Sequence, residues 1–144
     1  TMISNRCYYG LKAVLELAKR DGTGKVTICQ IANAQDIPQR FLEAILRQLK
    51  EAGYARAQRG KEGGYFLSKP ADKITAGEII LLFEGPLVTL GKRSGHTDYP
   101  DDVFHHLWTA AESALIEVYD SVNFHDLARD EKTRLSQAAP EYMI

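Results

Sequence analysis

Residues 27–70 read TICQIANAQDIPQRFLEAILRQLKEAGYARAQRGKEGGYFLSKP, and this stretch decides the fold. Thr27 and Gln30 form a capping-box pair ahead of an apolar run, which predicts a short helix ending at about Ala34. A short polar turn follows. Pro38 then suits the first position of a second helix, where its missing N–H would be unpaired in any case. Two helices joined by so short a turn predict a helix-turn-helix.

The second helix has two distinct faces. Its apolar positions follow the i, i+3, i+4, i+7 rule of a buried stripe and are Leu42, Ile45, Leu46 and Leu49. Its opposite face carries polar and charged side chains, which are Gln39, Arg40, Glu43, Arg47 and Lys50. The helix is expected to stop at Gly53.

A β-hairpin is expected after this helix. From Tyr54 to Arg59 alanines alternate with polar side chains at the period of a strand, and a return strand is expected from Tyr65 to Lys69. Glycines at 60, 63 and 64 permit positive φ in the connecting turn. The hairpin carries three cations, which are Arg56, Arg59 and Lys61. Helix, turn, helix and hairpin in this order predict a winged helix, whose basic surface suits a DNA groove better than a metabolite pocket.

The flanking segments complete a mostly α-helical fold. Helical periodicity predicts a first helix at residues 8–20, a capping pair predicts a fourth at residues 76–85, and a short final helix is expected at residues 125–135. A long helix is expected from about Asp102 to Val122. In a monomer this helix would leave apolar surface exposed. It is expected to pair with its copy about a two-fold axis, to pack against the first helix of its own domain, or both.

The expected architecture is therefore a winged helix-turn-helix with a small β-hairpin wing and a long C-terminal dimerisation helix. We expect residues 1–85 to form the DNA-binding domain, residues 86–101 a sensor-type loop, and residues 102–144 the dimerisation helix and a C-terminal helix.

The charges are distributed unevenly along the 144 residues. The net charge is −1, but residues 1–69 carry 12 Lys and Arg against 6 Asp and Glu, whereas residues 70–144 carry 6 against 13. The basic half coincides with the winged helix, where it can attract phosphate. No stretch approaches the roughly 18 consecutive apolar residues of a membrane span. We expect a cytoplasmic protein with no membrane partner.

The polar face of the second helix offers groups that read bases. Arginine can pair with guanine, glutamine with adenine, and glutamate can accept from cytosine, which assigns these roles to Arg40, Gln39 and Glu43. Arg59 would enter the minor groove or bind a phosphate. Arg47, Arg56 and Lys61 would add electrostatic support. The competing interpretation is a solvated helix face with no ligand.

Three segments resemble one family of bacterial regulators. They are Ile37-Pro38-x-x-Phe41-Leu42-Glu43-x-Ile45-Leu46-x-x-Leu49, Arg59-Gly60-x-x-Gly63-Gly64-Tyr65-x-Leu67 and Ile74-Thr75-x-Gly77-Glu78-Ile79-Ile80. This pattern is similar to the Rrf-two family of winged-helix transcriptional regulators. The resemblance implies a homodimer joined by the long helix and bound to palindromic promoter DNA. It also implies DNA contacts at Arg6, Gln39, Arg40, Glu43 and Arg59.

One departure from the family pattern concerns its cofactor. Many members hold an iron–sulfur cluster on three cysteines before the long helix, but residues 87–104 contain none. His105 matches a histidine that accompanies those cysteines in some members, yet alone it cannot hold the cluster. We therefore expect no cofactor, or an iron–sulfur cluster only through unusual ligands. The resemblance to members without these cysteines implies sensing through a partner protein, a small molecule or another route. For Cys7 and Cys29 the open alternatives are ligation of some other group and a thiol redox switch. Otherwise both cysteines are expected to be small buried side chains.

The start of the long helix offers candidate ligands for a different metal site. Asp101, His105 and His106 would suit zinc or iron(II), but acidic residues are common at a helix N-terminus without any metal. No motif of a catalytic triad, phosphate loop or metalloprotease is present, so we do not expect an enzyme. The alternative to a DNA-binding repressor is a protein-interaction module that keeps the winged helix and works through its acidic half.

Overall fold

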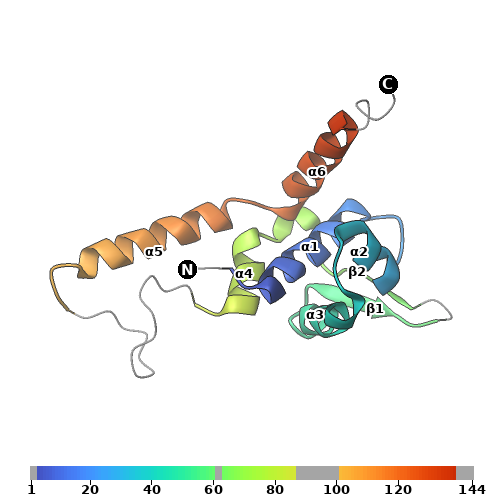
Figure 1. The fold of residues 1–144 in the computed structure, drawn as a ribbon, viewed down its shortest axis with the longest axis horizontal. Coiled ribbons are helices and arrows are strands. Elements are labelled where there is room, and N and C mark those ends of the chain that lie inside the picture. Colours follow the sequence, from blue (N-terminus) through green and yellow to red (C-terminus); the bar gives the residue numbers. More distant parts are fainter. Residues whose placement is uncertain (1–2, 61–62, 87–100, 139–144) are drawn as a thin grey trace.

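The computed structural model describes residues 3–60, 63–86 and 101–138. Its elements in chain order are α1 (Asn5–Lys19), α2 (Ile28–Gln35), α3 (Gln39–Glu51), β1 (Ala55–Gln58), β2 (Gly64–Leu67), the single 3-10 turn η1 (Ala71–Lys73), α4 (Ala76–Glu84), α5 (His105–Asp120) and α6 (Phe124–Ala138). Helices α1 to α4 and the hairpin form one body, from which α5 projects as an arm (Figure 1). The predicted class, mostly α with a small hairpin, is confirmed. Among the described helices none is long and apolar enough to cross a membrane.

Helix α1 forms the centre of the core and contacts α2, α3, α4 and α6. Its buried residues Val14 and Leu17 belong to the same apolar cluster as the buried face of α3. The four apolar residues predicted on that face, Leu42, Ile45, Leu46 and Leu49, are all buried. Each buried leucine or isoleucine contributes about 1.5–3 kcal/mol, so this stripe fixes which side of α3 faces outward.

Local capping signals set the starts of α2 and α4 as predicted. At α2 the Gln30 N–H donates to Thr27 Oγ1 over 3.1 Å, and the Thr27 N–H donates to Gln30 Oε1 over 2.9 Å. Thr75 and Glu78 make the same reciprocal pair at α4. Pro38 differs slightly from its predicted place, because its ψ of 124° is still extended. It precedes α3 as the N-cap, and the helix begins at Gln39.

The hairpin is held against the body at its base. Strand β1 pairs antiparallel with β2, and Tyr65 forms a further bridge with Val26. A Cβ on Gly64 would lie 2.8 Å from the Val26 carbonyl oxygen, so only glycine permits this close approach. Ala55 is buried but Ala57 is exposed, because the hairpin leaves the core beyond its base. The strands are shorter than the predicted 54–59 and 65–69.

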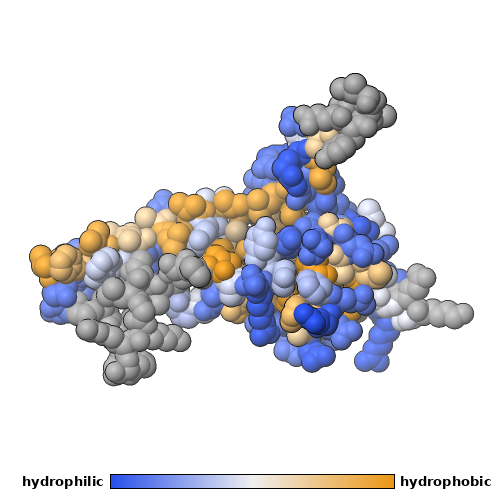
Figure 2. All heavy atoms as spheres, in the orientation of Figure 1, coloured by the Kyte–Doolittle hydropathy of each residue, from blue (hydrophilic) through white to orange (hydrophobic). Residues whose placement is uncertain are grey.

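Helix α5 packs against the body near its C-terminal end. There Leu115 and Tyr119 pack against a small cluster that contains Cys7 and Ile80. No residue of α5 is fully buried. The apolar side chains that remain exposed on and just before this helix are Val103, Phe104, Leu107, Ile116 and Val118. They contribute to the hydrophobic surface along the arm in Figure 2.

Several predicted helix bounds shift in the structure. Helix α1 begins at Asn5 rather than Tyr8, because the Ser4 side chain caps it. Helix α5 begins at His105 rather than Asp102, because the Asp102 carboxylate accepts from the Phe104 N–H in a preceding turn. Helix α5 ends at Asp120 rather than Val122, and α6 spans 124–138 rather than 125–135. The predicted sensor-type loop lies outside the described residues at 87–100.

Candidate nucleic-acid interface

The outer face of α3 gathers the predicted base-reading residues on one exposed strip. Gln39, Arg40, Glu43 and Arg47 are all exposed, on the side opposite the buried stripe. Within the described residues the ion pairs lie in α1 and α6, and none involves this strip. These side chains therefore keep their charges available to a ligand.

An aromatic pair that sequence reasoning missed supports Arg40. Its guanidinium carbon lies 4.7 Å from the centroid of the Phe41 ring, a cation–π contact. The Phe41 ring stacks in turn on Tyr9 of α1, with centroids 6.1 Å apart. Phe41 remains 44% exposed, which is unusual for a large apolar side chain. This arrangement restricts Arg40 before any ligand arrives.

Arg6 lies beside α3, and its guanidinium is already hydrogen-bonded to a side chain of that helix. Its Nη2 donates to Gln48 Oε1 over 2.6 Å, and Gln48 Nε2 donates to the Leu82 carbonyl oxygen over 3.3 Å. The chain of contacts joins α1, α3 and α4. Arg6 also lines a hollow of about 160 Å³ together with Tyr9 and Phe41. A DNA contact by Arg6 stays a prediction, and this geometry adds a role in fixing α3.

The hairpin brings further cations next to α3. Arg56 and Arg59 are exposed, and Lys61 lies outside the described residues. Lys69 was not singled out from the sequence, yet it lines a cleft together with Lys50 and Arg56. Its position directly before Pro70, at the end of the second strand, was the one available signal.

A buried carboxylate fixes α2 relative to α1. Glu16 Oε1 accepts from Gln35 Nε2 over 2.9 Å, and Glu16 Oε2 accepts from Arg20 Nε over 2.5 Å. Burial alone would raise the pKa of Glu16, but the hydrogen bonds from Gln35 and Arg20 and the charge of Lys19 lower it on balance. Gln35 is the last residue of α2, so this contact orients the helix-turn-helix.

The two cysteines occupy different environments. Cys7 is buried in α1, and burial, followed by the nearby Glu84 carboxylate, raises the pKa of its thiol to about 11. Cys29 is exposed, which contradicts the prediction that both are buried, because the buried positions of α2 are Ile31, Ala32 and Gln35. The two thiols lie on separate helices and are both free.

The donor set in the described residues does not fit an iron–sulfur cluster or another metal. The rings of His105 and His106 lie 5.9 Å apart, centroid to centroid. Nevertheless, no three His, Cys, Asp or Glu side chains are grouped as ligands in the described ranges, Asp101 included. The sequence adds no cysteine in residues 87–100.

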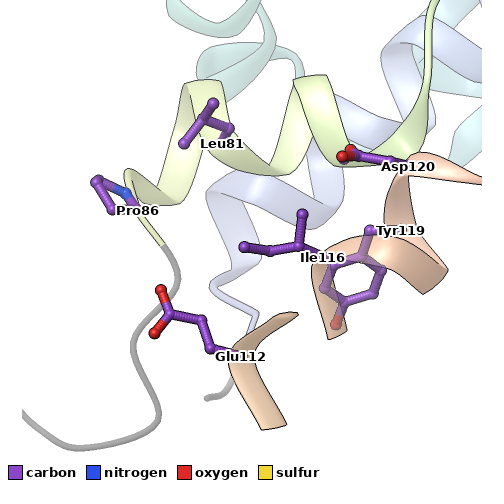
Figure 3. Close-up of a pocket in the computed structure, with 7 residues that line it drawn as sticks. Leu81, Pro86, Glu112, Ile116, Tyr119 and Asp120 are labelled. Atoms are coloured by element: carbon purple, nitrogen blue, oxygen red, sulfur yellow. The ribbon is translucent and has the colours of Figure 1, made fainter. Parts of the chain in front are cut away.

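A second hollow, of about 180 Å³, lies between α4 and α5. Figure 3 shows Leu81 and Pro86 on its α4 side, Ile116 and Tyr119 on its α5 side, and two carboxylates near opposite ends. Its lining is mainly apolar, and it lies at the junction between the arm and the body. A ligand here would contact both.

Comparisons with known proteins agree on the family. The family model Rrf2, described as an iron-dependent transcriptional regulator, matches residues 3–130. The chain is 35% identical over 126 residues to the HTH-type transcriptional regulator CymR of Bacillus subtilis, which covers 88% of each chain. The solved structure of CymR, described as the global cysteine regulator of B. subtilis, superposes with a TM-score of 0.77 at 34% identity, covering 90% of this chain and 97% of that one. IscR from T. potens superposes with a TM-score of 0.75 at 29% identity, covering 91% and 88%.

Proposed function

This chain belongs to the Rrf2 family of transcriptional regulators, and we propose that it is a homodimeric repressor that reads a palindromic promoter site with α3 and the hairpin. The members are DNA-binding regulators and not enzymes. The observation that carries the proposal is the exposed strip of α3, whose Arg40, Glu43 and Arg47 make no ion pair in the described residues. Such a protein acts where the chromosome is, in the cytoplasm.

Base readout is assigned to the N-terminal part of α3. Gln39, Arg40 and Glu43 occupy its first turns, which is the part of a recognition helix that reaches base edges. Arg59 reaches the neighbouring groove or backbone from the hairpin, and Arg6, Arg47, Arg56 and Lys61 hold phosphates.

The test is binding to DNA from the chain's own upstream region, followed by fluorescence anisotropy. Arg40→Ala should weaken specific binding by about 5- to 150-fold, the equivalent of one base contact of about 1–3 kcal/mol. Arg59→Ala should weaken it as well. Arg134→Ala on α6 serves as the matched control, because Arg134 pairs with Glu131 far along the chain from the strip. A stable protein partner that survives both substitutions, without any specific DNA binding, would favour the interaction-module alternative.

Dimerisation is assigned to α5. Leu107 and Val118 are 55% and 60% exposed, and the arm buries none of its residues fully. A second copy of the helix would cover this apolar surface, and two-fold pairing would place two α3 helices on half-sites about 34–36 Å apart. Leu107→Asp should therefore give monomers in sedimentation experiments. Leu135→Asp on α6, 48% exposed, is the control and should stay dimeric.

We propose that regulation does not use the three-cysteine cluster of the family. The support is the chain's donor set, with Cys7 buried, Cys29 exposed and no cysteine in residues 87–104. Absorption spectra of anaerobically purified protein, with iron and sulfide analysis, test this assignment. Visible bands with stoichiometric iron and sulfide would overturn it.

An effector, either a small molecule or a partner protein, is assigned to the hollow between α4 and α5. Residues 1–85 would then bind DNA, residues 102–144 would dimerise, and the segment 86–101 would complete the sensor. The test is a promoter reporter with cysteine plentiful or scarce, because the B. subtilis relative is described as a cysteine regulator. Leu81→Trp, which fills the hollow, should hold the reporter at one level while operator affinity is retained. A wild-type response of this variant would refute the assignment.

A further inference from the structure

A cleft of about 480 Å³ lies between the C-terminal end of α3 and the base of the hairpin. Small residues form much of its lining, including Gly53, Ala55, Ala57 and Ser68. The ionisable side chains that line it are Lys50, Arg56 and Lys69. The small side chains therefore leave room for a ligand, and the charged side chains that line the cleft are all positive.

Among the described residues, no acidic side chain forms an ion pair with any of these three cations. In the part of the chain that the structure describes, the ion pairs involve other residues, in α1 and α6. Lys50 lies in the last turn of α3, where it offsets the partial negative charge of the helix C-terminus. The net charge facing the cleft is therefore positive, which favours an anion.

Lys69 is held in place without losing its charge. Its Nζ lies 4.6 Å from the centroid of the Tyr54 ring. The Tyr54 hydroxyl lies 3.4 Å from Glu78 Oε1, which ties the ring to α4. A cation–π contact orients the ammonium but leaves its N–H groups able to donate to another oxygen. Lys69 is thus positioned before a ligand binds.

The cleft also continues the proposed DNA-binding strip. Glu43, Arg47 and Lys50 are spaced i, i+4 and i+7 along α3 and lie on one face. Arg56 and Arg59 follow on the hairpin. With α3 in a major groove and the hairpin at the adjacent minor groove, as proposed, the phosphate backbone that separates the two grooves would pass between α3 and the hairpin. The cleft lies between the C-terminal end of α3 and the base of the hairpin.

We propose that this cleft binds a phosphodiester of the DNA backbone, whose oxygens accept hydrogen bonds from Lys50, Arg56 and Lys69. The assignment rests on the proposed function and adds Lys69 to the residues that hold DNA. Phosphate contacts fix the register of a protein on the duplex but carry no sequence information directly. The cleft would therefore raise affinity for every DNA and keep the reading end of α3 in register.

The test is the salt dependence of operator binding by the full chain. For Lys69→Ala we expect the slope of log K against log salt to fall in magnitude by about 0.9, the value of one phosphate contact. Between 50 and 200 mM salt the variant should then lose about threefold less affinity than wild type. The ratio of operator to scrambled-DNA affinity should change little. Lys69→Arg, which keeps the charge, should restore the slope.

The matched control is Lys12→Ala. Lys12 also stacks on a tyrosine, with its Nζ 5.1 Å from the centroid of the Tyr8 ring, but it lines a different hollow beside α6. The slope of log K against log salt for Lys12→Ala should equal that of wild type. A wild-type slope for Lys69→Ala with an unchanged melting temperature would overturn the proposal. A second result would also overturn it. If millimolar inorganic phosphate shifts the Gly53 and Ser68 amide resonances to saturation and DNA does not compete, the cleft is a site for free anions. Failure of wild type to bind promoter DNA would instead overturn the proposed function.

Discussion

Replacing Glu16 by glutamine tests the contact that orients the helix-turn-helix. The Glu16 side chain is 3% exposed, and it accepts from Gln35 of α2 and from Arg20. The substitution keeps the size of the side chain and an acceptor for Gln35, but it removes the charge. A charge-assisted hydrogen bond contributes about 1.5–3 kcal/mol against about 0.5–1.5 for a neutral one. Arg20 is 35% exposed and can regain water, which reduces its share.

We therefore expect Glu16→Gln to lower the free energy of unfolding by about 1–2 kcal/mol at neutral pH, or the melting temperature by roughly 3–7 °C. Urea denaturation followed by circular dichroism measures this directly. Glu131→Gln is the control, because Glu131 pairs with an Arg134 that is 71% exposed. Its effect should stay within about 0.5 kcal/mol.

The stability difference between wild type and Glu16→Gln should also depend on pH. The pKa of Glu16 is lowered in the folded protein from its ordinary 4.5, so its carboxylate stabilises the fold above that value. As the pH falls through the folded pKa the stabilisation is lost, and the wild-type and Glu16→Gln stabilities should converge. A difference that stays constant from pH 7 to pH 3, or no difference at pH 7, would refute the reasoning.

Further outcomes follow from single contacts. Because the pKa of the Cys7 thiol is about 11, only about one thousandth of it is ionised at pH 8. A thiol reagent should therefore modify Cys29 alone in the folded protein and both cysteines after denaturation, which peptide mapping would show. Thr27→Ala removes the cap of α2 and should cost about 0.5–2 kcal/mol in urea denaturation, whereas Thr27→Ser should retain most of it. Gly10→Ala would place a Cβ in steric overlap with the Phe83 ring and should cost about 1–3 kcal/mol. Non-additivity with Phe83→Ala in a double-mutant cycle would confirm that the ring is the cause.

Features that depend on neighbouring residues could be predicted from the sequence. The capping pair at Thr27 and the buried stripe of α3 are local patterns, and both occur as expected. The exposed strip with Arg40 follows from the same periodicity, so its placement was predictable too. The contacts of each side chain could not be predicted from the sequence. Gln35 falls in the polar turn that the sequence predicts after Ala34, yet it is the buried last residue of α2. Its partner Glu16 lies 19 residues earlier, so no local pattern indicates the contact.

Packing also explains three features that the sequence analysis did not predict. Lys69 becomes part of a cleft only when the hairpin folds back beside α3. Cys29 is exposed because α2 is short and buries only one face. The spacing Glu16 to Arg20, i to i+4 on a helix, was the one sequence signal that could have drawn attention to the buried carboxylate.

The packing suggests how a signal at the arm could reach the DNA. Tyr119 of α5 packs in the cluster that holds Cys7 of α1, and Arg6 next to it bonds to Gln48 of α3. Packed side chains have few alternative arrangements, so a rotation of α5 would move α1 rather than be absorbed by it. Since α1 contacts α2, α3 and α4, the body should then move as one unit. An effector between α4 and α5 would thus change the distance between the two α3 helices of a dimer, and operators with one base pair added or removed between half-sites should report this change.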